Sequence, residues 1–432
     1  MNYTEEQILA LAPDDASRKS GKGLAGAANW VSFGTNNEAV WGECQGSGSK
    51  PYQTQVDLNN IAFKCSCPSR KFPCKHGVGL LLFYSKDPGN FSGKALPAWV
   101  SEWLSKRNEK AEKTEEKATK PVDEVAQAKR QQARISKVQD GVEELLLWIK
   151  DIVRNGAMNI PEKPFAFWNG MAKRMVDAQA PGLAGMVNGL AEIPYFKEGW
   201  QNTFLDRLLN MYLLIEGYKN IDAQPAAMQV ELRSLIGFTQ SQAELKAQPG
   251  IKDSWCVIAR QVTEEDRLTV EKFWLYGMQT GQYALILQFT VNSQSREIAL
   301  LPGSVIDAEL VFYNSALPLR ALLKEQTATR QSTTISGYEN WEAVIAAQVT
   351  CNEQNPFITE LPFVVDQLRP VSHNEQCWLQ DADNNMMQMV QNANLYEMLA
   401  LSGGQYLPMV VLGKENKYLP VGVWHNNEYK AL

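Results

Sequence analysis

Four potential metal ligands lie within twelve residues near the front of the chain: Cys65, Cys67, Cys74 and His76. Residues two apart in an extended segment point to the same side, so Cys65 and Cys67 can offer both sulfur atoms to one ion beside a strand. Pro73 and the apolar run 78–84 predict that Cys74 and His76 lie at the start of a helix. Three thiolates and one imidazole complete a tetrahedron, so the sequence predicts a structural zinc site with no position left for water.

A disulfide framework and a chance group of buried thiols are the two other interpretations of these cysteines. The chain has only seven cysteines in 432 residues, which is far from the composition of a disulfide-rich protein. The segment from Met1 to Glu6 has neither the basic start nor the apolar core of a signal peptide. We therefore expect a reducing, cytoplasmic environment and zinc as the cofactor.

The spacing C-x-C, six residues, C-x-H resembles that of the SWIM zinc finger. The similarity extends from the strand-like positions around Trp30, Trp41 and Tyr52 through the ligands to the helix expected over residues 77–84. SWIM modules occur in transposases, chromatin-remodelling ATPases, recombination factors and many bacterial proteins. The resemblance implies binding to DNA or to protein. Gly77 and Gly79 depart from it, because they occupy positions where helix formers are expected.

The charge of the chain is unevenly distributed. Residues 1–105 carry ten Lys/Arg against nine Asp/Glu, residues 106–135 nine against six, and residues 136–432 23 against 33. Any affinity for nucleic acid is therefore expected in the front of the chain. No acidic residue lies between Asp57 and Asp87. The candidate nucleic-acid-binding residues in that interval are Lys64, Arg70, Lys71 and Lys75, and the alternative is that they only solvate the surface around an anionic zinc–thiolate centre.

The sequence predicts an α+β protein with four parts. Residues 1–105 form the zinc module, a small antiparallel sheet with a helix, and end in a short helix over 97–104 that packs back on it. Residues 106–135 form a charged linker, because they contain almost no large apolar side chain. Residues 136–250 form a helical bundle, and residues 251–432 a strand-rich α+β domain with helices near 317–324, 341–347 and 395–400.

Three amphipathic stripes predict the core of the bundle. Each stripe combines residues three or four apart, and none contains a pattern that requires a cofactor. The stripes are Val142, Leu145, Leu146, Ile149, Ile152 and Val153; then Trp168, Met171, Met175 and Val176; then Phe204, Leu208, Met211, Tyr212 and Ile215.

Other chemistry has weaker support in the sequence. A complete phosphate-binding loop is missing around Gly21 and Gly23. The run from Asp381 begins like a calcium loop, but Met386 replaces the turn glycine, so we expect a hairpin turn. His373 and Cys377, which could share a helix face, remain candidates for a nucleophile and base, or for a second metal site with Cys351. No stretch approaches the ~18 apolar residues that indicate a transmembrane helix, so we expect no contact with a membrane.

Residues 174–183 and 312–321 also resemble the region that follows the finger in a bacterial SWIM zinc finger family. Members are often encoded beside MoxR-type AAA+ ATPases and von Willebrand factor A-type proteins, so this resemblance implies a protein partner. We expect a non-enzymatic adaptor that binds protein or DNA through its finger. The alternatives are a DNA-binding protein that uses the basic finger, and an enzyme with an unidentified site in the C-terminal region.

Overall fold

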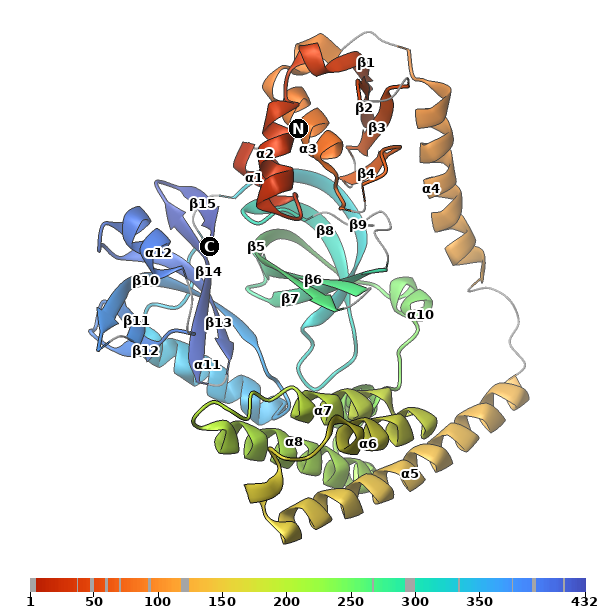
Figure 1. Cartoon of the computed structure of the whole chain (residues 1–432), viewed down its shortest axis with the longest axis vertical. Coiled ribbons are helices and arrows are strands. Elements are labelled where there is room, and N and C mark those ends of the chain that lie inside the picture. Colours follow the sequence, from red (N-terminus) through yellow and green to blue (C-terminus); the bar gives the residue numbers. More distant parts are fainter. Residues whose placement is uncertain are drawn as a thin grey trace.

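The protein consists of four parts that follow one another along the chain (Figure 1). The computed structural model describes residues 5–36, 38–46, 50–58, 61–69, 71–91, 95–117, 124–265, 268–291, 300–332, 335–374, 376–390, 394–414 and 416–432. A small α/β module lies at the top of Figure 1 and a helical bundle at the bottom, with a barrel and a second sheet between them. The predicted α+β class is confirmed.

Two short helices, a four-stranded antiparallel sheet and one helix form the first module. The sheet has the order β1-β2-β3-β4. Helix α3 packs against one face, where the buried Leu80 lies beside Gly42 of β2, while the buried Val78 lies beside Gly21 of α2. The elements are α1 (Glu5–Ala10), α2 (Asp15–Gly23), β1 (Trp30–Thr35), β2 (Ala39–Cys44), β3 (Tyr52–Asp57), β4 (Ala62–Cys65) and α3 (Lys75–Lys86).

The two glycines of α3 are explained by close packing on both sides of the helix. A Cβ atom at position 77 would lie 2.8 Å from the ring of Phe63 on β4. A Cβ atom at position 79 would lie 2.6 Å from the Cβ of Leu24 and 3.1 Å from the carbonyl oxygen of Gly21. Glycine therefore lets α3 approach the sheet and α2 at the same time, and this close approach offsets the weak helix propensity of both residues.

We predict that Gly79→Ala destabilises the first module by about 1–3 kcal/mol, because the new methyl group overlaps the Cβ atom of Leu24, which is fixed to the backbone and cannot rotate away, and crowds the carbonyl oxygen of Gly21. Gly23→Ala is the matched control, since a Cβ atom there has no neighbour within 4 Å. The control should be neutral or slightly stabilising. Urea unfolding monitored by hydrogen exchange in α3 measures both variants, and equal stability of the two would contradict this packing argument.

The segment predicted as a charged linker is largely helical. Helix α4 (Ala98–Lys117) is longer than the predicted short helix, and α5 (Glu124–Asn155) begins well before residue 136. As predicted, the start of α4 packs back on the module, because Val100 joins Ala39 and Trp41 on the sheet face opposite α3. Farther along α4, Arg107 Nε lies 3.3 Å from a carboxylate oxygen of Asp57. Helix-forming Glu and Lys residues continue α4 beyond its contact with the sheet.

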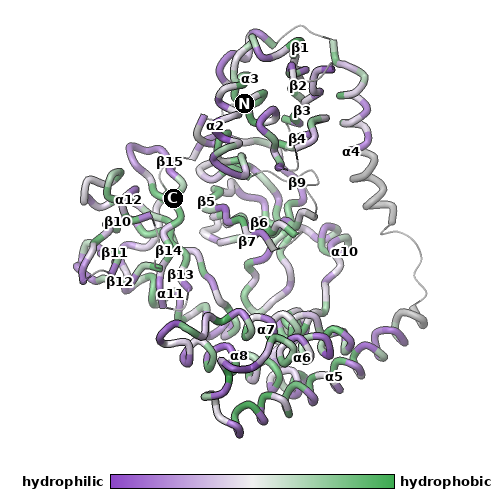
Figure 2. The backbone as a smooth tube through the Cα atoms, viewed as in Figure 1, coloured by the Kyte–Doolittle hydropathy of each residue, from purple (hydrophilic) through white to green (hydrophobic). Residues whose placement is uncertain are grey.

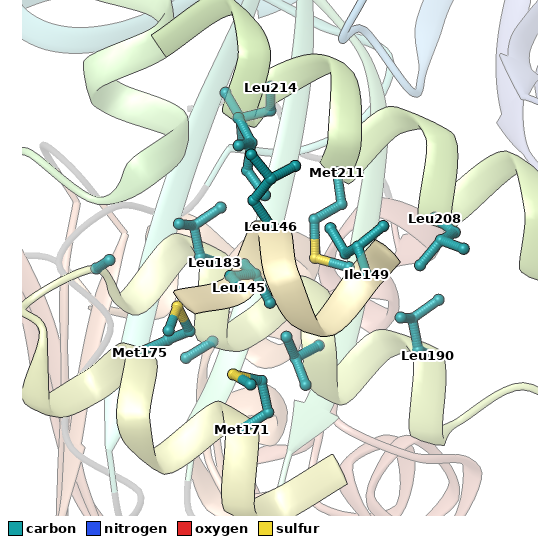
Figure 3. Packing of buried hydrophobic residues seen from close by; sticks show 14 of the residues in the cluster. Leu145, Leu146, Ile149, Met171, Met175, Leu183, Leu190, Leu208, Met211 and Leu214 are labelled. Atoms are coloured by element: carbon teal, nitrogen blue, oxygen red, sulfur yellow. The ribbon is translucent and has the colours of Figure 1, made fainter. Parts of the chain in front are cut away.

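The bundle is built from five helices around one apolar core, and Figure 3 shows its side chains pointing toward one another. In Figure 2, the coloured part of α5 alternates between hydrophobic and hydrophilic residues. The predicted stripes form this core except at Val153, Val176 and Tyr212, which are 64%, 58% and 38% exposed. The helices are α5, α6 (Phe165–Asp177), α7 (Pro181–Ala191), α8 (Trp200–Lys219) and α9 (Ala226–Ile236).

A closed barrel follows the bundle, with strand order β5-β6-β7-β9-β8. A hairpin loop at residues 277–281 joins β6 to β7. The helix predicted over residues 317–324 is wrong: these residues lead into β9, which pairs with β8 on one side and β7 on the other. The strands are β5 (Ile251–Glu265), β6 (Leu268–Gly277), β7 (Tyr283–Val291), β8 (Ser304–Phe312) and β9 (Arg320–Gln331).

Helix α10 (Gln242–Ala247) lies within the range predicted for the bundle but packs on the barrel. Leu245 contacts Val311 and Tyr313 there.

The last part is a six-stranded sheet of order β12-β11-β10-β13-β14-β15, with helices α11 (Trp341–Gln354) and α12 (Leu395–Ser402). Both helices share the buried core on one face of this sheet. The other face shares a buried cluster with the barrel that includes Trp274, Val364 and Trp424. The hairpin predicted at Asp381 joins β11 to β12, and β13 and β14 form a second antiparallel pair. The strands are β10 (Leu361–His373), β11 (Gln376–Asp381), β12 (Met386–Gln388), β13 (Leu407–Lys414), β14 (Lys417–His425) and β15 (Glu428–Ala431).

Two short segments join the parts. Leu300 lies in the barrel core while the next residue, Leu301, is buried in the core of the first module. Phe357, which follows α11, packs against the bundle, and Ile358 packs against the core of the six-stranded sheet. Adjacent residues therefore anchor different cores, which restricts how far the parts can separate.

Candidate metal centre

The four predicted ligands are brought together where β4 ends and α3 begins. Cys65 is the last residue of β4 and Cys67 lies two residues later. Cys74 is the N-cap residue of α3, and His76 lies in its first turn. The ligand atoms of all four side chains lie within 4.8 Å of one another. The predicted strand–loop–helix arrangement is therefore present.

The cluster is compact and partly shielded from solvent. His76 Nδ1 lies 3.7 Å from Cys65 Sγ and 3.8 Å from Cys74 Sγ, so this ring nitrogen faces the sulfur atoms. Cys74 and His76 are 3% and 5% exposed. The ring of Tyr52 on β3 lies 5.1 Å from the imidazole and restricts its orientation. These contacts orient the donor atoms toward one another.

A hydroxyl group supports one of the sulfur ligands. Thr54 is fully buried on β3, and its Oγ1 lies 3.2 Å from Cys65 Sγ. The hydroxyl can donate a hydrogen bond to a thiolate, which orients the sulfur and stabilises its negative charge. We did not predict Thr54 from the sequence, because its closeness to Cys65 depends on the pairing of β3 with β4.

Protons are shared unequally within the cluster. Hydrogen bonds from Cys65 and Cys74 lower the pKa of Cys67, and hydrogen bonding to Cys67 and Cys74, together with burial, raises the pKa of Cys65. Burial lowers the pKa of His76, but hydrogen bonds to Cys67 and Cys74 outweigh burial and raise it to about 9. A metal ion must therefore displace protons from Cys65 and His76 near neutral pH.

Three sulfur donors and one imidazole nitrogen at this spacing fit zinc. Zinc binds soft thiolates together with imidazole nitrogen. In structural sites it is coordinated by four such ligands in a tetrahedron. Cys65, Cys67, Cys74 and His76 would fill all four positions and leave none for water. The ion would therefore supply cross-linking of β4 to α3, while the protein supplies the complete ligand set.

Comparison with known protein families agrees with this geometry. Residues 52–85 match the family model of the SWIM zinc finger. The chain contains a SWIM finger. Residues 133–236 match the SWIM-associated four-helix bundle domain, which covers the region from α5 to α9. The search of curated proteins and the search of solved structures found no match.

The predicted basic residues of the finger differ in their surroundings. Lys64 and Lys75 are exposed directly beside the ligands Cys65 and His76. Lys71 instead forms an ion pair with Asp14, whose carboxylate also accepts a hydrogen bond from the N–H of Ser17 at the start of α2. The Lys71 hydrogen bond lowers the pKa of Asp14 to about 2. Arg70 lies outside the described residues.

Two further lysines near the SWIM finger are paired with an acidic residue of α1. Lys86 at the end of α3 and Lys22 of α2 both pair with Glu5, at 2.9 Å and 3.3 Å. Exposed pairs of this kind contribute little to stability, but they reduce the positive charge of the SWIM finger. Glu5 and Asp14 could not be predicted as partners, because they are far from these lysines in sequence.

The other candidate ligands do not form a second centre. His373 and Cys377 lie on strands β10 and β11, so they do not share a helix face. Cys351 and Cys377 are partly buried and pack against the core of the six-stranded sheet. Within the described ranges, the group at the SWIM finger is the one cluster of three or more potential ligands. Among the same residues, no helix is long and apolar enough to cross a membrane.

Asp381 has a structural role. Its buried carboxylate accepts hydrogen bonds from the N–H groups of Trp341, Asp383 and Asn385. It therefore joins the β11–β12 turn to the start of α11. The prediction of a hairpin turn is confirmed.

We predict that Cys74→Ser abolishes zinc binding and increases hydrogen exchange around the ligands in residues 61–86, since the metal joins the end of β4 to the start of α3. The helical bundle should remain folded. Elemental analysis measures the zinc, and hydrogen exchange measures the folding of each part. The control is Cys44→Ala, which removes a buried thiol of the same sheet outside the cluster and should retain zinc. Retention of zinc by Cys74→Ser would contradict the ligand assignment.

Zinc affinity should fall as the pH is lowered from about 8 to about 6, because protons then compete more strongly with zinc for ligands whose pKa is raised. The raised pKa values belong to Cys65 and His76. Zinc binding near neutral pH should therefore release protons. Titration calorimetry in buffers with different ionisation enthalpies measures this release, and a binding enthalpy independent of the buffer would show that the ligands are already deprotonated.

Proposed function

We propose that this protein is a non-enzymatic recognition adaptor that uses its SWIM finger and its helical bundle to bind macromolecules. The closed ligand set supports a structural role for zinc, because catalysis at zinc needs an open coordination position. Family models match the SWIM finger and the bundle. The proposal is that the metal fixes the shape of one binding module and the bundle presents another.

The observation that carries this proposal is an exposed apolar stripe on α8. Leu205, Leu209 and Leu213 follow one another at four-residue intervals and are 50%, 52% and 46% exposed. The opposite side of α8, with Phe204 and Leu208, is buried in the bundle. A helix at a water-exposed surface normally carries polar residues on its outer side. A stripe of leucines there supports contact with another protein.

We propose that the partner on this stripe is a MoxR-type AAA+ ATPase, in a system that also contains a von Willebrand factor A-type protein. The resemblance of residues 174–183 and 312–321 to a bacterial SWIM family supports this choice. The net charge of residues 136–432, with 23 Lys/Arg against 33 Asp/Glu, favours a protein over DNA as the ligand of this region. The adaptor itself would hydrolyse no ATP.

The stripe can be tested by charge insertion. Leu209→Glu should weaken capture of the ATPase by roughly tenfold or more, because it places a charge in the middle of an apolar contact. Asn210→Glu is the matched control: it adds the same charge one residue later on α8, also at an exposed position. Affinity purification of the tagged full-length chain from its own cells measures capture. If both variants retain the ATPase equally, or if wild type captures none, this partner assignment fails.

DNA binding by the SWIM finger is the second candidate, and the exposure of Lys64 and Lys75 beside the ligands favours it. If it is correct, Lys64→Ala with Lys75→Ala should weaken binding to DNA of any sequence. The slope of affinity against salt should decrease by about 0.9 for each lost phosphate contact. Lys71→Ala is the control, since Lys71 is paired with Asp14 and should contribute less. DNA binding that is unchanged in the variant with Lys64→Ala and Lys75→Ala, or no DNA binding at low salt, would exclude this candidate.

A catalytic site in the C-terminal region is the remaining alternative. His373 and Cys377 lie on paired strands, but His373 aligns with Gln376 and Cys377 with Ser372, so the two candidates are not direct cross-strand partners. We propose no reaction for these residues.

A further inference from the structure

A pocket of about 620 Å³ lies where the bundle meets the barrel, away from the metal centre. Arg130 and Arg134 of α5 line one side, together with Gln179, which follows α6. The rest of the pocket lining comes from the segment 238–248, which contains α10, and from Asn314, which follows β8. Pockets of this volume are typical of sites for small molecules.

Arg134 is held rigidly at this pocket. Its Nη2 donates hydrogen bonds to the carbonyl oxygens of Gly237 at 2.9 Å and Gln179 at 3.2 Å. The guanidinium lies over the ring of Phe238, 4.3 Å from the ring centre. Both hydrogen bonds use Nη2, so among the described residues the other terminal nitrogen, Nη1, keeps its N–H groups for a ligand, whereas Nε is buried and out of a ligand's reach. A fixed guanidinium with donors left over is suited to bind a carboxylate or a phosphate group.

The charged residues of the lining favour an anion. Arg130 lies one helical turn before Arg134 and contributes a second guanidinium, whereas Glu244 contributes the one carboxylate in the described lining. The remaining walls carry mainly amide and hydroxyl groups, including Gln240 and Ser241. Such groups can hydrogen-bond a polar ligand body while the two arginines bind its charged end.

The pocket also spans two parts of the molecule. The Gln240 side chain donates to the carbonyl oxygen of Asn314 at 2.8 Å and accepts from its N–H at 3.0 Å. A ligand in the pocket would therefore contact α5 of the bundle and a loop of the barrel at once. Binding would resist their separation.

We propose that this pocket binds a small polar molecule with a phosphate or carboxylate group, and that the bound anion fastens the bundle to the barrel. The proposal is independent of the partner on α8 and of the ligand of the SWIM finger. Inorganic phosphate, adenosine monophosphate and succinate are the probes, because they separate phosphate from carboxylate recognition and test whether a larger body is needed. Full-length, zinc-loaded protein is titrated by calorimetry, and thermal unfolding is followed with each probe.

Three variants are expected to change the affinity for the probe in three different ways. Arg130→Ala should weaken binding of the preferred probe by roughly tenfold, since it removes a charge-assisted hydrogen bond from an exposed side chain. Glu244→Gln should strengthen binding, because it removes the negative charge of the lining. Lys129→Ala is the matched control, since Lys129 is exposed on the same helix but does not line the pocket.

Binding that is weakened in Arg130→Ala, strengthened in Glu244→Gln and unchanged in Lys129→Ala supports the proposal, as does a rise in unfolding temperature with the probe. Equal weakening in Arg130→Ala and Lys129→Ala would indicate attraction by general charge and overturn it. Absence of binding by all three probes would also overturn it.

Discussion

The ligand cluster of Cys65, Cys67, Cys74 and His76 is the constraint on which the first module depends. It joins the end of β4 to the start of α3, so the helix is fixed at its N-terminus against the sheet. Helix α3 packs on one face of the sheet, and the start of α4 contacts the other face at Ala39 and Trp41. The SWIM finger is therefore a compact body that is closed to a macromolecule between α3 and the sheet, while Lys64 on β4 and Lys75 at the start of α3 remain exposed.

The rest of the chain is coupled to this body through buried contacts between neighbouring residues. Leu301 lies in the core of the finger module, and Leu300 lies in the core of the barrel. The barrel in turn shares a core with the six-stranded sheet, and Phe357 links that region to the bundle. Unfolding of the finger would expose Leu301. A fragment that begins at Ser136 lacks the finger module and would therefore expose Leu301 on its surface. Leu301→Gln would replace this exposed apolar side chain with a polar one.

The ligands and the amphipathic helices could be predicted from the sequence because both signals are local. Cys65 and His76 are eleven residues apart, and a helical stripe is complete within a few turns. The roles of Gly77 and Gly79 could not be predicted, because the neighbours that exclude a side chain there belong to β4 and α2. The pairing of Lys71 with Asp14 joins residues 57 positions apart and leaves no local pattern.

Residues 317–324 show how tertiary structure overrides a local signal. Leu317, Leu319 and Leu322 suit a helix by composition, but the edges of β7 and β8 both offer hydrogen bonds to this segment. Pairing with both strands closes the barrel and removes two open edges. The exposed leucines of α8 were missed for a different reason: leucine is a strong helix former, and the sequence alone does not show which side of a helix remains uncovered.

The central claim is that the metal centre is closed and structural, and X-ray absorption spectroscopy at the zinc edge of the purified protein tests it most directly. The account predicts three sulfur atoms at ~2.3 Å and one nitrogen at ~2.0–2.1 Å, with no oxygen in the first shell. The spectrum should not change with added protein partner or DNA. A water or carboxylate oxygen bound to zinc, or fewer than three sulfur atoms, would contradict the account, because an open position would make the centre available for chemistry.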